Sequence, residues 1–183
     1  MPARHDRRRA GTRAFIALWP DSATRQQFAR IAEQCAHVAH GRAVPAHNLH
    51  LTLAFLGNLP DDMIEAVKSE LHATAFAPFT LQFDQVGFWP RARIIWTGAR
   101  VIPDELRDLA AQVRGMLDRQ GLPVERRRFA AHVTLVRKAG RRPRVEPEPI
   151  AWWVNGLHLV GSTLTPDGAC YEMLAEVAAK DGN

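Results

Sequence analysis

The chain of 183 residues weighs 20.5 kDa, a size that fits one compact domain or two small lobes sharing a core. Hydrophobic residues make up 46% and charged residues 23%, which excludes a disordered or fibrous chain. No apolar run approaches the roughly 20 residues that cross a bilayer, and no signal-peptide core follows the basic start. Two cysteines, Cys35 and Cys170, are too few for a disulfide scaffold. These features predict a cytoplasmic protein without membrane association.

Positive charge is concentrated in two segments of a chain whose net charge is +5. Residues 1–13 carry +4, and residues 126–144 carry +8 with no acidic residue, which leaves −7 on the rest of the chain. We expect a basic flexible tail over 1–12 and a single bilobal domain over 13–183. Arginines fixed on a folded surface suit phosphate, because each guanidinium can bond two oxygens at once. A merely solvated loop over 138–144 is the alternative.

In chain order, apolar periodicity and turn residues predict a series of strands and helices. The expected strands cover residues 13–19, 49–56, 79–86, 93–97, 131–137, 152–164 and 170–178. The expected helices run from Asp21 to Gly41, from Pro60 to about His72 and from Pro103 to Gly121. Of the tryptophans, Trp19, Trp96, Trp152 and Trp153 are expected in the core, and Trp89 in a loop.

The first half of this pattern recurs in the second half. Pro20-Asp21 and Pro103-Asp104 both follow a strand and begin a helix, and they are 83 residues apart. The strands that follow these helices carry His50 and His132, which are 82 residues apart. The offset predicts two similar β-α-β halves. We therefore predict an α+β fold, a bilobal pseudo-twofold arrangement of two mostly antiparallel sheets with helices on the outer faces and the active cleft between the lobes.

Two of the predicted strands carry the same His-x-Thr pattern. Because side chains alternate along a strand, the first strand is expected to present His50, Thr52 and Ala54 on one face and to bury Leu51, Leu53 and Phe55 on the other. In the second strand, His132 and Thr134 point together, away from Val133 and Leu135. A third copy, His72-Ala-Thr74, falls at the end of a predicted helix, where residues two apart diverge. We predict that His72 has no part in the site.

The paired histidines indicate acid–base chemistry at phosphorus. A single histidine is usually a partly buried polar residue with a satisfied hydrogen bond. Two of them at matching positions of two halves, each beside a small hydroxyl, favour a catalytic pair in which one imidazole takes a proton and the other gives one. No Asp, Glu or Cys lies within four residues of His50 or His132, and the chain has no phosphate-binding loop or adenylation lysine. We predict no metal and no cofactor.

The two motifs, His50-Leu-Thr-Leu-Ala-Phe-Leu-Gly57 and His132-Val-Thr-Leu-Val-Arg137, resemble those of the 2H phosphoesterase superfamily. Within it, the chain is most similar to the bacterial RNA 2′,3′-cyclic phosphodiesterases, also called 2′-5′ RNA ligases. The likeness extends over residues 13–21, 48–57, 129–137 and 162–174. The sequence departs from the family pattern at Ala131, where Pro is usual, and in a C-terminal segment that lacks the usual closing Trp.

The resemblance implies a bilobal enzyme that hydrolyses a terminal 2′,3′-cyclic phosphate to a 2′-phosphate, with ATP-independent 2′-5′ ligation as a side activity. His50 would be the proton donor and His132 the proton acceptor. Thr52, Thr134 and Arg137 would bind phosphate, although Arg137 has the opposite strand parity from His132, so that its role needs the strand to bend or end there. Tyr171 would contact the substrate. The expected partner is RNA with a 2′,3′-cyclic phosphate end, tRNA-like fragments included, bound by a monomer with no obligatory protein partner.

Two other functions remain open from the sequence. A second enzyme hypothesis keeps the site and changes the substrate to a small cyclic nucleotide phosphate, such as a cyclic ADP-ribose phosphate, or to a 2′-5′ oligonucleotide. A third hypothesis is a non-catalytic module that binds RNA or a nucleotide. The charge over 126–144 favours a polyanion over a mononucleotide, because several phosphates would benefit from it.

Overall fold

A computed structural model of the protein describes residues 11–124, 129–166 and 168–180. Most of the predicted N-terminal tail, and Arg126, Arg127 and Arg128 of the basic segment, lie outside these ranges. The strands are β1 (Thr12–Leu18), β2 (Arg42–Ala43), β3 (Leu51–Leu59), β4 (Phe79–Phe83), β5 (Gln85–Trp89), β6 (Ile94–Gly98), β7 (His132–Arg137), β8 (Ile150–Val154), β9 (Gly156–Thr165) and β10 (Gly168–Ala178). The helices are α1 (Ser22–Ala39), α2 (Asp61–Ala73), α3 (Asp104–Arg119) and the short 3-10 helix η1 (Ala46–Asn48).

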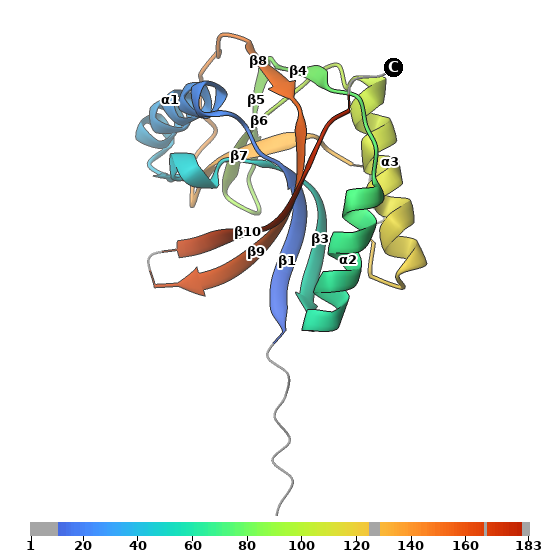
Figure 1. Ribbon diagram of the computed structural model, residues 1–183. Helices are drawn as coiled ribbons and strands as arrows, with labels where there is room; N and C mark the ends of the chain where they lie inside the picture. Colours follow the sequence, from blue (N-terminus) through green and yellow to red (C-terminus); the bar gives the residue numbers. More distant parts are fainter. Residues whose placement is uncertain (1–10, 125–128, 167, 181–183) are drawn as a thin grey trace, which may run out of the picture.

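Two antiparallel sheets form the fold, as predicted (Figure 1). The main sheet has the order β10-β9-β1-β3-β7-β6-β5, with β2 paired to β7, and β4 and β8 form a small second sheet. The main sheet consists of two halves, one built on β1 and β3 and the other on β6 and β7. One residue pair joins β3 to β7, Leu51 with Val133, and both side chains are fully buried. We call this pair the joint.

The helices are exchanged between the two halves of the sheet. Helix α1 lies between β1 and β3 in the chain, yet it packs on β7, β2 and β8. Helix α3 lies between β6 and β7, yet it packs on β3 and α2. Figure 1 shows α1 on one side of the molecule and α2 and α3 together on the other. The exchange ties the halves together by helix packing, so the narrow joint is not their only connection.

Helix α1 begins and packs as its sequence predicts. The Asp21 carboxylate accepts hydrogen bonds from the backbone N–H groups of Ala23 and Thr24 at 2.8 and 2.9 Å, and these bonds lower the pKa of Asp21. Phe28 packs edge-on against Phe83 of β4 and Trp152 of β8. Trp152 is therefore a core residue, as predicted, whereas the prediction for Trp153 was wrong: it is 53% exposed because it alternates with Trp152 along β8.

Two predicted strands are each broken into two. Residues 79–86 divide into β4 and β5 around Asp84, whose Oδ1 accepts a hydrogen bond from the Arg100 N–H at 2.9 Å. Residues 152–164 fall in β8 and β9, which are separated by Asn155, whose carbonyl accepts a hydrogen bond from the Ala179 N–H at 2.8 Å. Because of these breaks, β4 and β8 lie outside the main sheet and pair with each other. Within the described ranges, no helix has the length and apolar character that crossing a membrane requires.

Candidate active site

The joint places the four residues of the two His-Thr motifs on one face of the sheet. Leu51 and Val133 directly follow His50 and His132. In an antiparallel pair, the residue before one partner faces the residue after the other, so the two motifs meet across the joint. The pseudo-twofold axis therefore passes through the joint. All four motif side chains are half-buried, on the face opposite the buried Leu51 and Val133.

Both imidazoles are held through the same ring nitrogen. His50 Nδ1 lies 2.8 Å from the Asn48 carbonyl oxygen, and His132 Nδ1 lies 2.7 Å from the Ala130 carbonyl oxygen. A carbonyl only accepts hydrogen bonds, so each Nδ1 carries a hydrogen, and each Nε2 of a neutral ring has a free lone pair. His50 Nε2 lies 3.1 Å from Thr52 Oγ1. The geometry thus leaves Nε2 of each ring as the nitrogen that can take up or give a proton.

His50 lies among aromatic side chains. Trp19 stacks on it with ring centroids 4.9 Å apart and planes 4° apart, and Phe15 stacks at 4.9 Å and 29°. Tyr171 meets the His50 ring edge-on at 5.3 Å. Burial among these rings, reinforced by the positive charges of Arg137 and His132, lowers the pKa of His50 to about 4 against the pull of its bond to Asn48. Trp19 was predicted in the core, but it is half-buried and covers the histidine.

The second histidine has its own aromatic neighbours. Trp89 meets the His132 ring edge-on at 4.7 Å and contacts Trp96 at 5.4 Å. Trp89 ends β5 and does not lie in a loop, and Trp96 pairs with Thr134 across the strands on the site face, half-buried, so both predictions were wrong. Burial also lowers the pKa of His132. Gly87 allows this packing, because a Cβ there would lie 2.1 Å from the Trp96 ring.

Bulges in β3 and β7 turn two further residues toward the site. Thr52 and Ala54 pair with the consecutive residues Ala17 and Ile16, so Leu53 is an extra residue in β3. The bulge reverses the side-chain parity beyond Leu53. The predicted faces of Ala54 and Phe55 were therefore wrong: Ala54 shares the face of Ile16, whereas Phe55 is 66% exposed and pairs with Phe15 on the site face.

The equivalent bulge in β7 acts on Arg137. Thr134 and Val136 pair with the consecutive residues Trp96 and Ile95, so Leu135 is the extra residue. Leu135 and Val136 are both buried, and the parity change turns the exposed Arg137 toward the side of the sheet that carries His132. The strand thus departs from regular alternation before Arg137 and ends at it, which meets the condition for the predicted role of Arg137, and the positive charge of Arg137 lowers the pKa of His50.

A hydrogen bond between η1 and the start of β10 positions Tyr171 beside His50. Asn48, the last residue of η1, donates a hydrogen bond from Nδ2 to the Ala169 carbonyl at 2.9 Å. The same residue accepts the His50 ring bond on its own carbonyl. Asn48 therefore orients the imidazole and positions the strand that carries Tyr171. Asn48, Phe15 and Trp19 lie within segments that resemble the family pattern, which is the only sequence signal for their place at the site.

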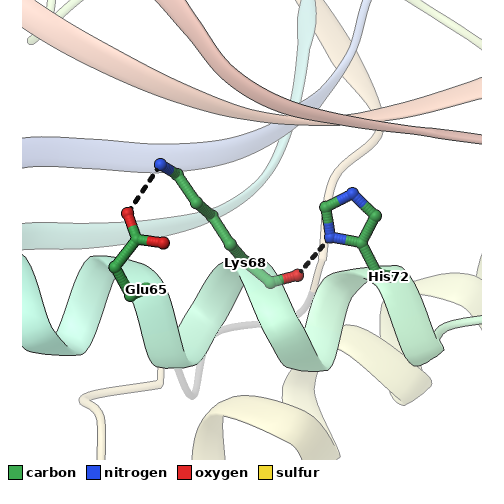
Figure 2. Close-up of polar contacts among 3 residues, drawn as sticks. All are labelled: Glu65, Lys68 and His72. Atoms are coloured by element: carbon green, nitrogen blue, oxygen red, sulfur yellow. Dashed lines mark hydrogen bonds and ion pairs between the residues drawn. The ribbon is translucent and has the colours of Figure 1, made fainter.

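The third His-x-Thr copy lies outside the site, as predicted. Figure 2 shows His72 in the last turn of α2, with Nδ1 2.7 Å from the Lys68 carbonyl oxygen, while Lys68 Nζ contacts Glu65 at 2.8 Å. Thr74 donates to the Glu70 carbonyl instead of facing His72. As for metals, the described residues contain no group of three or more His, Cys, Asp or Glu side chains placed to hold an ion.

Comparisons with known proteins show the family to which the chain belongs. The profile of the LigT like Phosphoesterase family matches residues 18–96. The RNA 2′,3′-cyclic phosphodiesterase of Escherichia coli is 37% identical over 131 residues, which are 68% of this chain and 74% of that protein. The enzyme of the same name from Archaeoglobus fulgidus is 30% identical over 173 residues, or 88% and 97%. The crystal structure of Escherichia coli LigT complexed with 3′-AMP superposes with a TM-score of 0.86 at 30% identity, covering 93% of this chain and 99% of that one. The chain therefore belongs to the LigT-like phosphoesterase family of the 2H superfamily, as its paired motifs predicted.

Proposed function

We propose that this protein is an RNA 2′,3′-cyclic phosphodiesterase, which hydrolyses a terminal 2′,3′-cyclic phosphate to a 2′-phosphate. The observation that carries the proposal is the meeting of the two His-Thr motifs across the joint, where each ring is held by Nδ1 and Nε2 is the nitrogen left to exchange a proton. The names of the relatives support the same activity, and so does the nucleotide in the matching LigT structure. We further propose that residues 13–183 act as one bilobal unit and as a monomer.

In the proposed mechanism, His132 Nε2 takes a proton from a water molecule, and the water oxygen attacks phosphorus. The bond from phosphorus to the 3′-oxygen breaks, and His50 Nε2 gives its proton to that oxygen. The products are a 3′-hydroxyl and a 2′-phosphate, and the proton held by His132 recharges His50 through solvent. No metal or cofactor takes part in these steps. Ligation is the same displacement with a 5′-hydroxyl in place of water: its oxygen attacks phosphorus, His132 takes its proton, and the bond to the 3′-oxygen breaks, which leaves a 2′-5′ linkage and a 3′-hydroxyl.

The remaining site residues would stabilise the charge that develops on the phosphate. Thr52 and Thr134 can donate hydroxyl hydrogen bonds to the non-bridging oxygens, one from each side of the joint. Arg137, turned toward this side of the sheet by the bulge at Leu135, can bind two oxygens through its guanidinium. Tyr171, edge-on to His50, would contact the sugar or base of the terminal nucleotide.

The proposal is tested by the phosphate isomer that the protein forms. We expect an RNA oligonucleotide with a 2′,3′-cyclic end to be converted to the 2′-phosphate, with none of the 3′-phosphate, because the 3′-oxygen is the one that His50 protonates. Phosphorus NMR of the products distinguishes the two isomers. A 3′-phosphate product would mean that the 2′-oxygen leaves and would contradict the proposed reaction, and binding without any product would favour the non-catalytic module.

The low pKa values of the two histidines predict different pH profiles for kcat/KM and kcat. In the free protein, His50 titrates at about 4 and His132 below 6.5, so the acid His50 loses its proton on the acidic side of neutrality. The maximum of kcat/KM is therefore expected below pH 6.5. A bound anionic phosphate stabilises both imidazolium ions, which raises their pKa values and moves the maximum of kcat to higher pH. Coincident maxima would contradict this account.

A further inference from the structure

A row of basic side chains leads away from the proposed site. Arg137, the last residue of β7, pairs with Arg42 of β2. The loop after β7 adds Lys138, Arg141, Arg142 and Arg144. All six side chains are exposed, and no acidic residue occurs between Arg137 and Arg144; Glu146 and Glu148 follow. We call these six residues the basic track.

The loop after β7, which carries the other four residues of the basic track, is hydrogen-bonded to the rest of the fold. The Gly140 N–H donates to the Ala39 carbonyl at 2.8 Å, and Arg141 Nε donates to the Val38 carbonyl at 2.9 Å, so the loop is bound to the last turn of α1. On its other side, the Ala139 N–H donates to the Arg93 carbonyl at 2.9 Å, and Arg93 Nε returns a bond to the Ala139 carbonyl at 3.1 Å. These bonds argue against a merely solvated loop.

The three arginines that the loop after β7 adds to the basic track line a hollow in the protein surface. Val38, Arg141, Arg142, Pro143 and Arg144 line a surface hollow of about 790 Å³. In the described part of the chain, none of the ion pairs involves an arginine of this hollow. Like charges gathered without acidic partners repel one another, and an anion seated among them relieves that repulsion. The hollow therefore suits phosphate groups.

We propose that the basic track binds the phosphate backbone of the RNA on the 5′ side of the terminal nucleotide. The inference rests on the proposed function, because it starts from a cyclic phosphate held at Arg137. That phosphate is at the 3′ end of the RNA, so the rest of the strand leaves the site toward its 5′ end. Arg137 belongs both to the site and to the track, and the next cations along the surface are Arg42 and Lys138. A second and a third phosphate would then lie near Arg141, Arg142 and Arg144.

This path makes a chain of several nucleotides a better substrate than a mononucleotide. Each phosphate neutralised by an arginine adds affinity without base readout, and the added affinity falls as salt rises. For single strands, the slope of log affinity against log salt changes by about 0.7 for each phosphate contact. The track thus extends the substrate class from a cyclic nucleotide to an RNA end of at least three nucleotides.

The test compares two substrates on two double variants. Arg142→Ala/Arg144→Ala removes two track charges and keeps the Arg141 bond to Val38 intact. Arg107→Ala/Arg114→Ala removes the same charge from α3, which packs on the other half of the sheet. The substrates are an eight-nucleotide RNA with a 2′,3′-cyclic end and 2′,3′-cyclic AMP, each assayed from low to physiological salt. Fluorescence anisotropy with the same RNA carrying a 2′-phosphate gives binding without turnover.

For the track variant, we expect kcat/KM on the oligonucleotide to fall about tenfold at low salt, and the salt slope to flatten by about 1.4. Turnover of cyclic AMP should be unchanged, and the α3 variant should match the wild type on both substrates. Equal losses on both substrates, or no loss in either turnover or binding of the oligonucleotide, would overturn the proposal. If the wild type hydrolyses neither substrate, the proposed function fails, and the anisotropy comparison still decides whether the track binds RNA.

Discussion

Replacing His132 by alanine is expected to lower kcat on RNA with a 2′,3′-cyclic end by about 10²–10⁴-fold, since the attacking water then has no proton acceptor. His50→Ala should cause a loss in the same range, because the 3′-oxygen would leave without a proton. The double variant should be little worse than either single one, since both groups act in one displacement. Single-turnover kinetics on a labelled RNA measure all three losses.

His72→Ala is the matched control for these variants. It removes an imidazole from a third His-x-Thr sequence, but one that lies on α2 and binds only the Lys68 carbonyl among its described contacts. We expect its kcat to equal that of the wild type. Circular dichroism should show the same fold for every variant, because His50 and His132 are half-buried on the site face and do not belong to the core. Wild-type kcat after the loss of either site histidine would exclude the paired mechanism.

Side-chain alternation was sufficient to pair each histidine with its threonine. His50 with Thr52, and His132 with Thr134, lie on one face because the strand between them is regular, and the buried Leu51 and Val133 confirm the opposite face. The repeat of 82 residues indicated two related halves. That the halves meet at the residue following each histidine could not be predicted, because pairing between distant strands depends on tertiary packing and not on local pattern.

Contacts between residues far apart in the chain account for the features that the sequence pattern did not predict. Helices α1 and α3 each pack on strands of the other half, although each lies between strands of its own half in the chain. Trp19 was expected in the core because it closes an apolar strand, yet it is half-buried and stacks on His50. An apolar ring that shields an imidazole of the proposed site follows the same local pattern as a core ring. Whether such a ring lies in the core or beside the histidine depends on how the two halves of the molecule pack together.

The bulges are the local feature that alternation could not predict. Leu53 in β3 and Leu135 in β7 are each an extra residue that reverses the side-chain parity of the residues directly after it. The two bulges occupy equivalent places in the repeat, so Phe55 and Arg137 are turned toward the site at matching positions. The pseudo-twofold scaffold thus presents an aromatic ring on one side and a guanidinium on the other. This difference between the halves suits an asymmetric substrate, in which one group is a phosphate to be bound and another is a leaving group.

Arg137→Ala is therefore expected to lower kcat by about 10²–10³-fold, the usual cost of removing one group that stabilises transition-state charge. Arg137→Lys should recover only part of the loss, because an ammonium keeps the charge but not the bidentate fork. Removing the positive charge should also raise the pKa of His50 from about 4, since Arg137 disfavours its imidazolium form. The change in kcat reports the binding of the phosphate by Arg137, and the change in the His50 pKa reports its electrostatic effect on the proton donor.

Two measurements distinguish these roles of Arg137. An NMR titration of the free protein should show the His50 pKa higher in Arg137→Ala than in the wild type, and near the wild-type value in Arg137→Lys. Arg107→Ala, which removes a guanidinium from α3, should change neither kcat nor the His50 titration. If Arg137→Ala raised the His50 pKa and left kcat unchanged, the guanidinium would act on the histidine alone and would not bind the phosphate. The bulge at Leu135 would then place a charge that lowers the pKa of His50 and nothing more.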